Sequence, residues 1–137
     1  MEGGRHATID KRIFGAFIDW LLISVPVVAV MLMLSIVTQK EIKTLSSLLF
    51  VLLQLGYEGF MYATRNGQTF GKIAMNTRVV RPDGSPISAG QAWARAAAKV
   101  ILGCLFFVDY IPAFLTADRA TVHDMITRTR VMEIVRA

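Results

Sequence analysis

The chain has 137 residues, of which 54% are hydrophobic and only 18% charged, and its mean hydropathy is +0.50. This composition is typical of an integral membrane protein and argues against an ordinary soluble domain. In that setting the net charge of +5 indicates basic loops facing anionic lipid, so we expect membrane lipid and not nucleic acid as a partner.

A single cysteine excludes a disulfide framework. With two histidines, His6 and His123, the chain offers no recognisable set of metal ligands. The sequence also shows no Ser-His-Asp or Cys-His arrangement of the kind that hydrolases use. We therefore expect a protein that is not an enzyme and that has no cofactor and no metal site.

Residues 13–37 form an apolar stretch whose only charge is Asp19. At 1.5 Å per residue, a helix of this length reaches roughly 37 Å, enough to cross a bilayer with some tilt. A secretory signal is the alternative, but the stretch is too long for a signal core and no small-residue cleavage site ends it. Residues 13–37 are therefore predicted to be a first span, with Thr8 as a plausible N-cap.

A polar turn at residues 39–43 separates this stretch from the second predicted span, residues 44–63, in which Glu58 is the only charge. Gly56 and Gly59 lie one turn apart in that span. Small residues at this spacing allow close packing of a neighbouring helix. Both glycines are therefore expected to have a packing role.

The segment 64–88 is polar and basic, and its residues 75–81 and the later residues 129–135 are rich in β-branched side chains. We expect two short strands, paired with each other on the cytoplasmic face; two unpaired extended loops are the alternative. The motif GQTFGK at residues 67–72 resembles a phosphate-binding loop. It is one residue short, lacks the Ser or Thr after the lysine and follows a span, so nucleotide binding is rejected.

Residues 89–116 form a third apolar region, opened by a capping box at Ser88 and Gln91. Beyond Lys99 it has only about 16 apolar positions, interrupted by Asp109 and Pro112, which is short for one span. A shorter helical or re-entrant hairpin is predicted, followed by a tail at residues 117–137. The fold class is thus an α-helical membrane protein with two transmembrane helices and this hairpin, forming one domain over residues 1–137.

Residues 69–80 align without a gap onto residues 121–132, with an offset of 52. Both strings are basic and each follows an apolar stretch, so both are expected on one side of the membrane. The positive-inside rule leads to the same topology, with both termini and residues 65–81 in the cytoplasm. Two spans with a re-entrant hairpin, or four spans, satisfy it.

Charges inside apolar segments are candidates for function. Counted from the cytoplasmic ends, Asp19 and Glu58 have similar depth, and Arg12 and Arg95 can reach the same layer. The group could bind an ion or proton, or could be a static network that holds the helices together. For His123 and Asp124, which are adjacent, a solvated or capping role is expected, because neighbouring residues rarely face each other.

The chain resembles the RDD family of bacterial membrane proteins, which is named for one arginine and two aspartates. The similarity lies in KRIFGAFID at residues 11–19, in GQTFGK at residues 67–72 with the RPDG turn that follows at 81–84, and in the C-terminal HD and TRVM strings. It identifies Arg12, Asp19 and Asp124 as the named residues and Arg95 as the arginine opening the next apolar region. Glu58 and Asp109 lie outside the pattern. The resemblance implies transport of ions or small ligands.

From these observations we expect a multi-pass protein of the bacterial inner membrane that transports or exchanges a small ion or ligand by means of an intramembrane carboxylate. Asp19 is the first choice for that carboxylate, with a small cation or proton as its ligand. So small a chain is expected to form a homo-oligomer or to bind a membrane partner. The alternative is a non-transporting scaffold or assembly subunit whose charges are structural. The predicted ion- or ligand-binding residues are Asp19, Glu58, Arg12, Arg95, Asp109 and Asp124.

Overall fold

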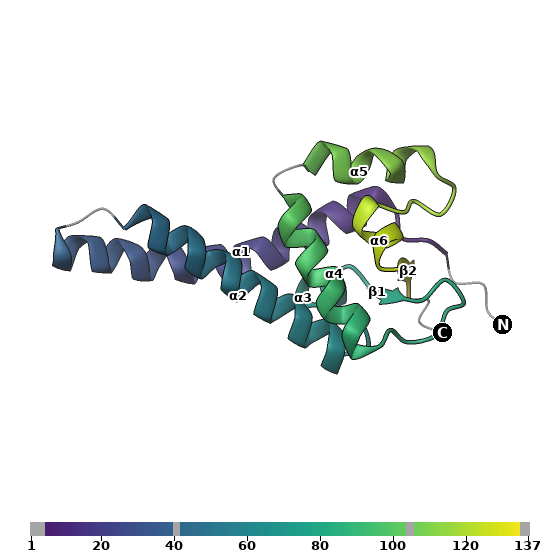
Figure 1. Cartoon of the computed structure of the whole chain (residues 1–137). Coiled ribbons are helices and arrows are strands. Elements are labelled where there is room, and N and C mark those ends of the chain that lie inside the picture. The colour runs from purple at the N-terminus through teal and green to yellow at the C-terminus, as the bar shows by residue number, and fades with distance from the viewer. Residues whose placement is uncertain (1–4, 40–41, 104–105, 135–137) are drawn as a thin grey trace.

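A computed structural model describes residues 5–39, 42–103 and 106–134. It is mostly helical, and its order of elements is α1 (Ile9–Thr38), α2 (Lys43–Thr64), α3 (Phe70–Ala74), β1 (Thr77–Val80), α4 (Ala89–Leu102), α5 (Phe106–Leu115), α6 (Val122–Ile126) and β2 (Arg130–Glu133). Helices α1 and α2 run side by side as a long hairpin, and the other elements gather at one end of it together with both termini (Figure 1). We call that end the base of the hairpin.

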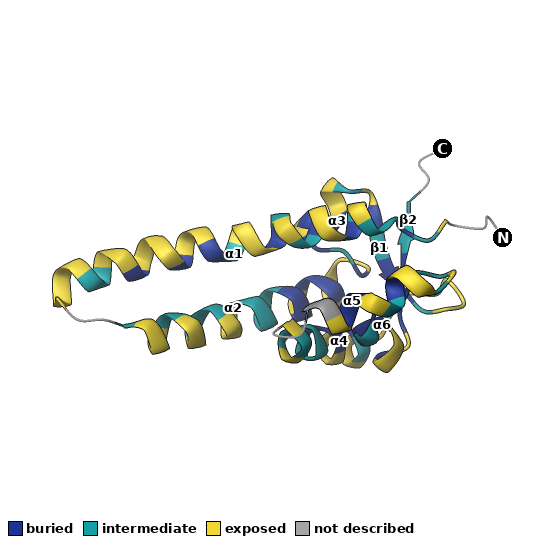
Figure 2. Ribbon diagram, turned by 90° about the horizontal axis from the view of Figure 1, so that it is seen from above, coloured by how far each residue is buried: buried dark blue, intermediate teal, exposed yellow. Residues whose placement is uncertain are grey.

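Within the described residues, α1 and α2 are the two helices that are long and apolar enough to cross a membrane, as the sequence predicted. Away from the base, their side chains are mostly exposed (Figure 2). Val25, Ile36 and Val37 on α1, for example, are 61%, 76% and 74% exposed. An apolar surface of this extent on a single chain is normal when lipid surrounds the helix.

Most of the buried residues lie at the base of the hairpin (Figure 2). Helix α4 packs along α2, and Gly59 makes this possible, because a Cβ atom there would lie 2.2 Å from the ring of Trp93. The packing role expected for Gly59 is thus confirmed. At Gly56 a Cβ would meet nothing within 4 Å, so the expectation for this glycine was wrong. The small apolar core consists of Ala7, Tyr62, Val79, Ala92 and Val131.

Strands β1 and β2 form a two-stranded antiparallel sheet in which Val79 lies opposite Val131. These two valines are also equivalent under the repeat of 52 residues. The two copies of the repeat therefore pair about a local twofold axis between Val79 and Val131. The predicted second strand extended to residue 135, which lies outside the described residues; β2 itself ends at Glu133.

The repeat extends to the short helices before the strands. Thr69 caps α3 and Thr121 caps α6, each accepting a hydrogen bond from a backbone N–H three residues on. After each helix a residue at the equivalent position has a positive φ, 53° at Asn76 and 51° at Arg128. The sequence similarity thus reflects two copies of one helix–turn–strand unit, residues 69–80 and residues 121–132, which we call the first and second repeat.

Candidate functional site

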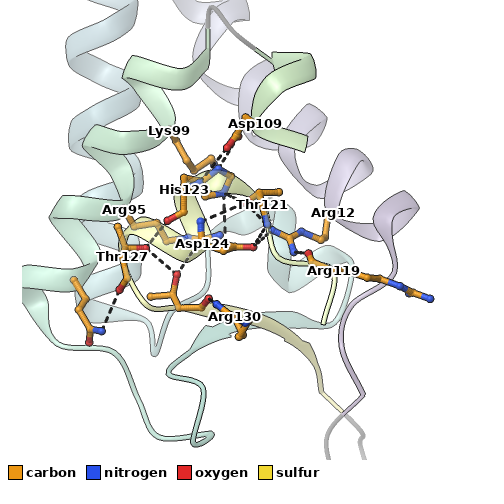
Figure 3. Close-up of polar contacts among 12 residues, drawn as sticks. Arg12, Arg95, Lys99, Asp109, Arg119, Thr121, His123, Asp124, Thr127 and Arg130 are labelled. Atoms are coloured by element: carbon orange, nitrogen blue, oxygen red, sulfur yellow. Dashed lines mark hydrogen bonds and ion pairs between the residues drawn. The ribbon is translucent and has the colours of Figure 1, made fainter. Parts of the chain in front are cut away.

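Asp124 lies at the centre of a buried group of charges at the base of the hairpin (Figure 3). Its two carboxylate oxygens accept hydrogen bonds from the guanidinium groups of Arg12 on α1 and Arg95 on α4. All three side chains are buried, with Asp124 0% exposed. Three segments that are far apart in the sequence are therefore joined through one carboxylate.

Further hydrogen bonds complete this group. Arg95 donates to the hydroxyl of Thr129 at 2.7 Å, and Asp124 accepts from the backbone N–H of Thr121 at 3.0 Å, which closes a capping box on α6. Burial favours a higher pKa for Asp124, but the cations Arg95 and Arg12 outweigh it and hold that pKa well below its usual value. Asp124 is therefore a permanent anion, and both of its ion-pair partners are arginines of this chain.

The capping role expected for Asp124 is confirmed, whereas a solvated position is wrong for both members of the His123–Asp124 pair. His123 is 2% exposed. Adjacent residues on a helix point in different directions, so the two side chains have separate partners. Asp124 binds the two arginines, while His123 faces Asp109 on α5.

Asp109 holds His123 through two hydrogen bonds. Its Oδ1 accepts from the backbone N–H of His123 at 3.1 Å, and its Oδ2 lies 2.6 Å from Nδ1 of the imidazole ring. Burial, with the charge of Arg95, lowers the pKa of His123 to about 4 despite the two nearby carboxylates. A neutral ring is then protonated on Nδ1, and its Nε2 accepts a hydrogen bond from Thr121 at 3.1 Å.

Asp19 on α1 is buried and accepts three hydrogen bonds. The donors are the Tyr57 hydroxyl at 2.7 Å, the Thr69 hydroxyl at 2.5 Å and the backbone N–H of Gly71 at 2.8 Å. These contacts attach the start of α3 to both long helices. The expected approach of Arg12 to Asp19 is not found: the Arg12 guanidinium extends to α6 and binds Asp124 there.

Glu58 on α2 forms an ion pair with Lys99 of α4. The lysine Nζ lies 2.6 Å and 2.7 Å from the two carboxylate oxygens, and Gln54 donates a third hydrogen bond at 2.6 Å. Arg95 or Arg12 was expected to approach Glu58 in this layer. Lys99 lies one helical turn beyond Arg95 on the same face of α4. Because α6 and α2 lie beside different turns of α4, Arg95 binds Asp124 on α6 and Lys99 binds Glu58 on α2.

A cavity of about 580 Å³ lies beside the Glu58–Lys99 ion pair and the hydrogen-bonded Asp109–His123 pair. Its walls come from α1, α2, α4 and α5, with His123 from α6, and are largely apolar. Its polar groups come from these two pairs and Gln54. The lining residues are Ile13, Ala16, Phe17, Trp20, Phe50, Val51, Gln54, Glu58, Lys99, Val100, Gly103, Asp109, Tyr110 and His123. Of the predicted site residues, Glu58 and Asp109 line it, whereas Asp19, Arg12, Arg95 and Asp124 do not.

Lys72 on α3 is also buried, at 6% exposure. Among the described residues its ammonium group has no ion-pair partner within 4.0 Å. Burial and the nearby charges of Lys99 and Arg95 lower the pKa of Lys72 to about 7, against the attraction of Asp19. Sequence reasoning rejected a phosphate-loop role for this lysine but did not predict its burial.

Sequence reasoning also missed Lys99, Tyr57 and Thr69. The repeat contained a signal for two of them. Thr69 is equivalent to Thr121, the cap of α6, and the same offset of 52 relates Tyr57 to Asp109. Tyr57 accepts from the N–H of Phe70 at 3.0 Å, much as Asp109 accepts from that of His123. Over the described residues, no group of three His, Cys, Asp or Glu side chains could hold a metal ion.

Comparison with known proteins places this geometry in context. The family model described as the RDD family matches residues 6–128. The chain is 25% identical over 141 aligned positions to "Uncharacterized protein YxaI" of Bacillus subtilis (strain 168), covering 88% of this chain and 93% of that protein. No solved structure gives a significant match.

Proposed function

The chain belongs to the RDD family of membrane proteins, and we propose that it moves a small ion or ligand across the bacterial inner membrane by binding it in the cavity beside Glu58 and Asp109. The single observation that carries this proposal is the cavity itself. Its volume of about 580 Å³ lies in the range of ligand sites, which typically combine apolar walls with a few convergent polar groups.

The proposal divides the predicted site residues into two groups. Glu58 and Asp109 face the cavity, so they are the carboxylates that would contact the ligand. Arg12, Arg95 and Asp124 satisfy one another, and Asp19 accepts three hydrogen bonds from the start of α3 and from α2. These four residues fasten the helices that form the cavity walls. The prediction that Asp19 itself binds the ion stays open and is tested below.

A topology with both termini in the cytoplasm belongs to the same proposal. Both repeats and the described ends of the chain lie at the base of the hairpin (Figure 1), and most of the basic residues that flank the spans belong to these segments. Helices α4 and α5, of 14 and 10 residues, would form a hairpin that enters the bilayer from the cytoplasm and returns. A cysteine introduced at Asp83, in the turn after β1, should resist an impermeant thiol reagent in intact cells carrying Cys104→Ser, and labelling there would contradict this topology.

The distal half of the α1–α2 hairpin supports an assembly of several chains. Among the described residues this half consists of the distal parts of α1 and α2, and most of their side chains are exposed (Figure 2). Two helices enclose no path across a membrane by themselves. A homo-oligomer, or a complex with another membrane protein, would supply the missing walls, and crosslinking in membranes would detect it.

A non-transporting scaffold is the second candidate, and one observation favours it. The Arg12–Asp124–Arg95 group is buried and each of its charges has an ion-pair partner within the group, as expected for charges that only hold helices in place. Under this alternative the cavity would contain lipid, and the purified protein would transport nothing.

Flux through proteoliposomes separates the two functions. We expect the purified chain to catalyse flux of at least one cation, measured over several cations with and without a pH gradient. Glu58→Gln and Asp109→Asn should abolish that flux, while Asp83→Asn in the exposed turn should leave it unchanged. Absence of flux for every cation from a folded protein would favour the scaffold.

Asp19→Asn distinguishes binding from fastening in the same assay. Asparagine keeps the shape and can still accept hydrogen bonds, so a protein in which Asp19 only fastens α3 should retain flux after a modest loss of stability. A folded Asp19→Asn variant without flux would instead support Asp19 as the ion-binding carboxylate. The comparison requires that both proteins elute alike in size-exclusion chromatography.

A further inference from the structure

The cavity is too large and too apolar for a bare ion. At the roughly 30 Å³ that a water molecule occupies in the liquid, a volume of about 580 Å³ would leave an ion surrounded by many water molecules against apolar walls. Apolar cavities exclude water and accept apolar molecules. The body of the ligand should therefore be organic and apolar.

The polar groups of the cavity carry a net negative charge. Glu58 and Asp109 are carboxylates, and Lys99 is the one ammonium group among the lining residues. His123 is neutral at neutral pH because burial lowers its pKa. Among the lining residues, two anions and one cation leave one negative charge unbalanced, and an opposite charge on a ligand is attracted to it.

Gln54 adds an unused acceptor to this region. Its Nε2 donates to Glu58 at 2.6 Å, which orients the amide so that its oxygen points the other way. That Oε1 atom is buried and has no hydrogen-bond partner among the residues that the structure describes. Leaving a buried acceptor unpaired costs about 1–3 kcal/mol, so a ligand that brings a donor or a positive charge to this oxygen would be stabilised.

The walls contain four aromatic side chains, Phe17, Trp20, Phe50 and Tyr110. Phe17 and Trp20 are stacked, with ring centroids 6.0 Å apart. The faces of aromatic rings attract cations, by up to about 2 kcal/mol in desolvated sites. Aromatic walls, an excess anion and a free acceptor all favour the same kind of molecule.

We propose that the ligand of this cavity is a lipophilic cation, an amine or onium compound whose apolar body packs on the aromatic walls and whose positive charge faces Glu58 and Asp109. This inference rests on the cavity of the proposed function and specifies its ligand class.

Equilibrium binding of two matched probes tests the ligand class on the unaltered protein. Tetraphenylphosphonium and tetraphenylborate have nearly the same shape and apolar surface and carry opposite charges. With the chain in nanodiscs of zwitterionic lipid, and empty nanodiscs as background, we expect saturable binding of the phosphonium and none of the borate. Equal binding of both, or of neither, would overturn the proposal.

Variants of the lining residues test whether the phosphonium binds in this cavity. Asp109→Asn removes the excess negative charge and should weaken phosphonium binding at least about tenfold, the equivalent of 1.4 kcal/mol. Ala16→Phe fills the cavity without altering any charge and should abolish binding, while Asp83→Asn should not affect it. Unchanged binding in folded Ala16→Phe and Asp109→Asn proteins would place the phosphonium elsewhere and overturn the assignment.

The ligand class and the proposed function can fail separately. Flux of inorganic cations by a protein that does not bind the phosphonium would overturn the ligand class and leave transport standing. Saturable phosphonium binding without any flux, including flux of the phosphonium itself, would support the ligand class and overturn transport.

Discussion

The first and second repeats have the same backbone and opposite electrostatics. Residue 72 of the first repeat and residue 124 of the second are equivalent under the offset of 52, and both side chains are buried at the base of the hairpin. One is Lys72, a cation without an ion-pair partner among the described residues; the other is Asp124, an anion held by two arginines. Thus the same position holds an anion with two ion-pair partners in the second repeat and a cation without an ion-pair partner in the first.

The preceding position differs in a similar way. Gly71 lets α3 approach α1 so closely that a Cβ atom would lie 1.9 Å from the carbonyl oxygen of Gly15. Its equivalent, His123, has a full side chain, which packs toward α5 and binds Asp109. The first repeat is therefore fastened by backbone contact with a long helix, and the second by side-chain ion pairs. A duplicated local structure need not have duplicated interactions.

Removing the central carboxylate of the second repeat should have the largest effect on stability. Asp124→Asn would leave Arg12 and Arg95 buried without an anion, and removal of one partner from a buried ion pair costs about 3–5 kcal/mol. We expect a marked fall in the unfolding midpoint, or loss of folded protein, in detergent. The triple change Arg12→Met, Arg95→Leu and Asp124→Leu removes all the charges together and should be much less harmful. A single variant as stable as the parent would contradict the fastening role.

The close contact of the first repeat predicts a smaller effect. Gly71→Ala should destabilise the protein by about 1–3 kcal/mol, typical of overpacking, because neither Gly15 nor the backbone of α3 can move easily. Gly56→Ala on α2 is the matched control, since a Cβ there meets nothing within 4 Å. It should be neutral or stabilising by up to about 1 kcal/mol. Equal unfolding midpoints for the two variants would show that the α1–α3 contact is not as close as described.

The low pKa of Lys72 in the first repeat predicts that the free energy of unfolding depends on pH. Its pKa of about 7 in the folded protein is lower than the value of about 10.4 for a lysine in an unfolded chain. Between these values the unfolded chain binds one more proton, so the free energy of unfolding should rise with pH by about 1.4 kcal/mol per unit. Below pH 7 Lys72 is protonated in both the folded and the unfolded chain, so the free energy of unfolding is lowered by the full amount. Lys72→Met should flatten this rise in denaturation curves measured from pH 7 to pH 10, and identical slopes in the two proteins would contradict the prediction.

Much of the fold follows from local sequence. The length and apolarity of the stretches around Asp19 and Glu58 are sufficient for two long helices, because each needs only an unbroken run of apolar side chains in lipid. The capping box at Ser88 and the end of β1 at the RPDG turn are equally local signals. So is the repeat, which put both of its copies on one side of the membrane; the two threonine-capped helices within it were not predicted. The RDD pattern itself was recognisable from short strings of residues.

The pairing of the charges was decided only by the tertiary structure. Sequence identified Arg12, Asp19, Glu58 and Arg95 as candidates at similar depth, and Asp109 and Asp124 as further candidates, but depth along a helix does not specify which face turns toward which neighbour. Arg95 and Lys99 share one face of α4 and diverge to Asp124 and Glu58 because α6 and α2 lie beside different turns of that helix. Asp109 meets His123 only because the chain folds back after α5. The cavity arises from four helices packed against one another, and such packing depends on contacts between residues far apart in the sequence.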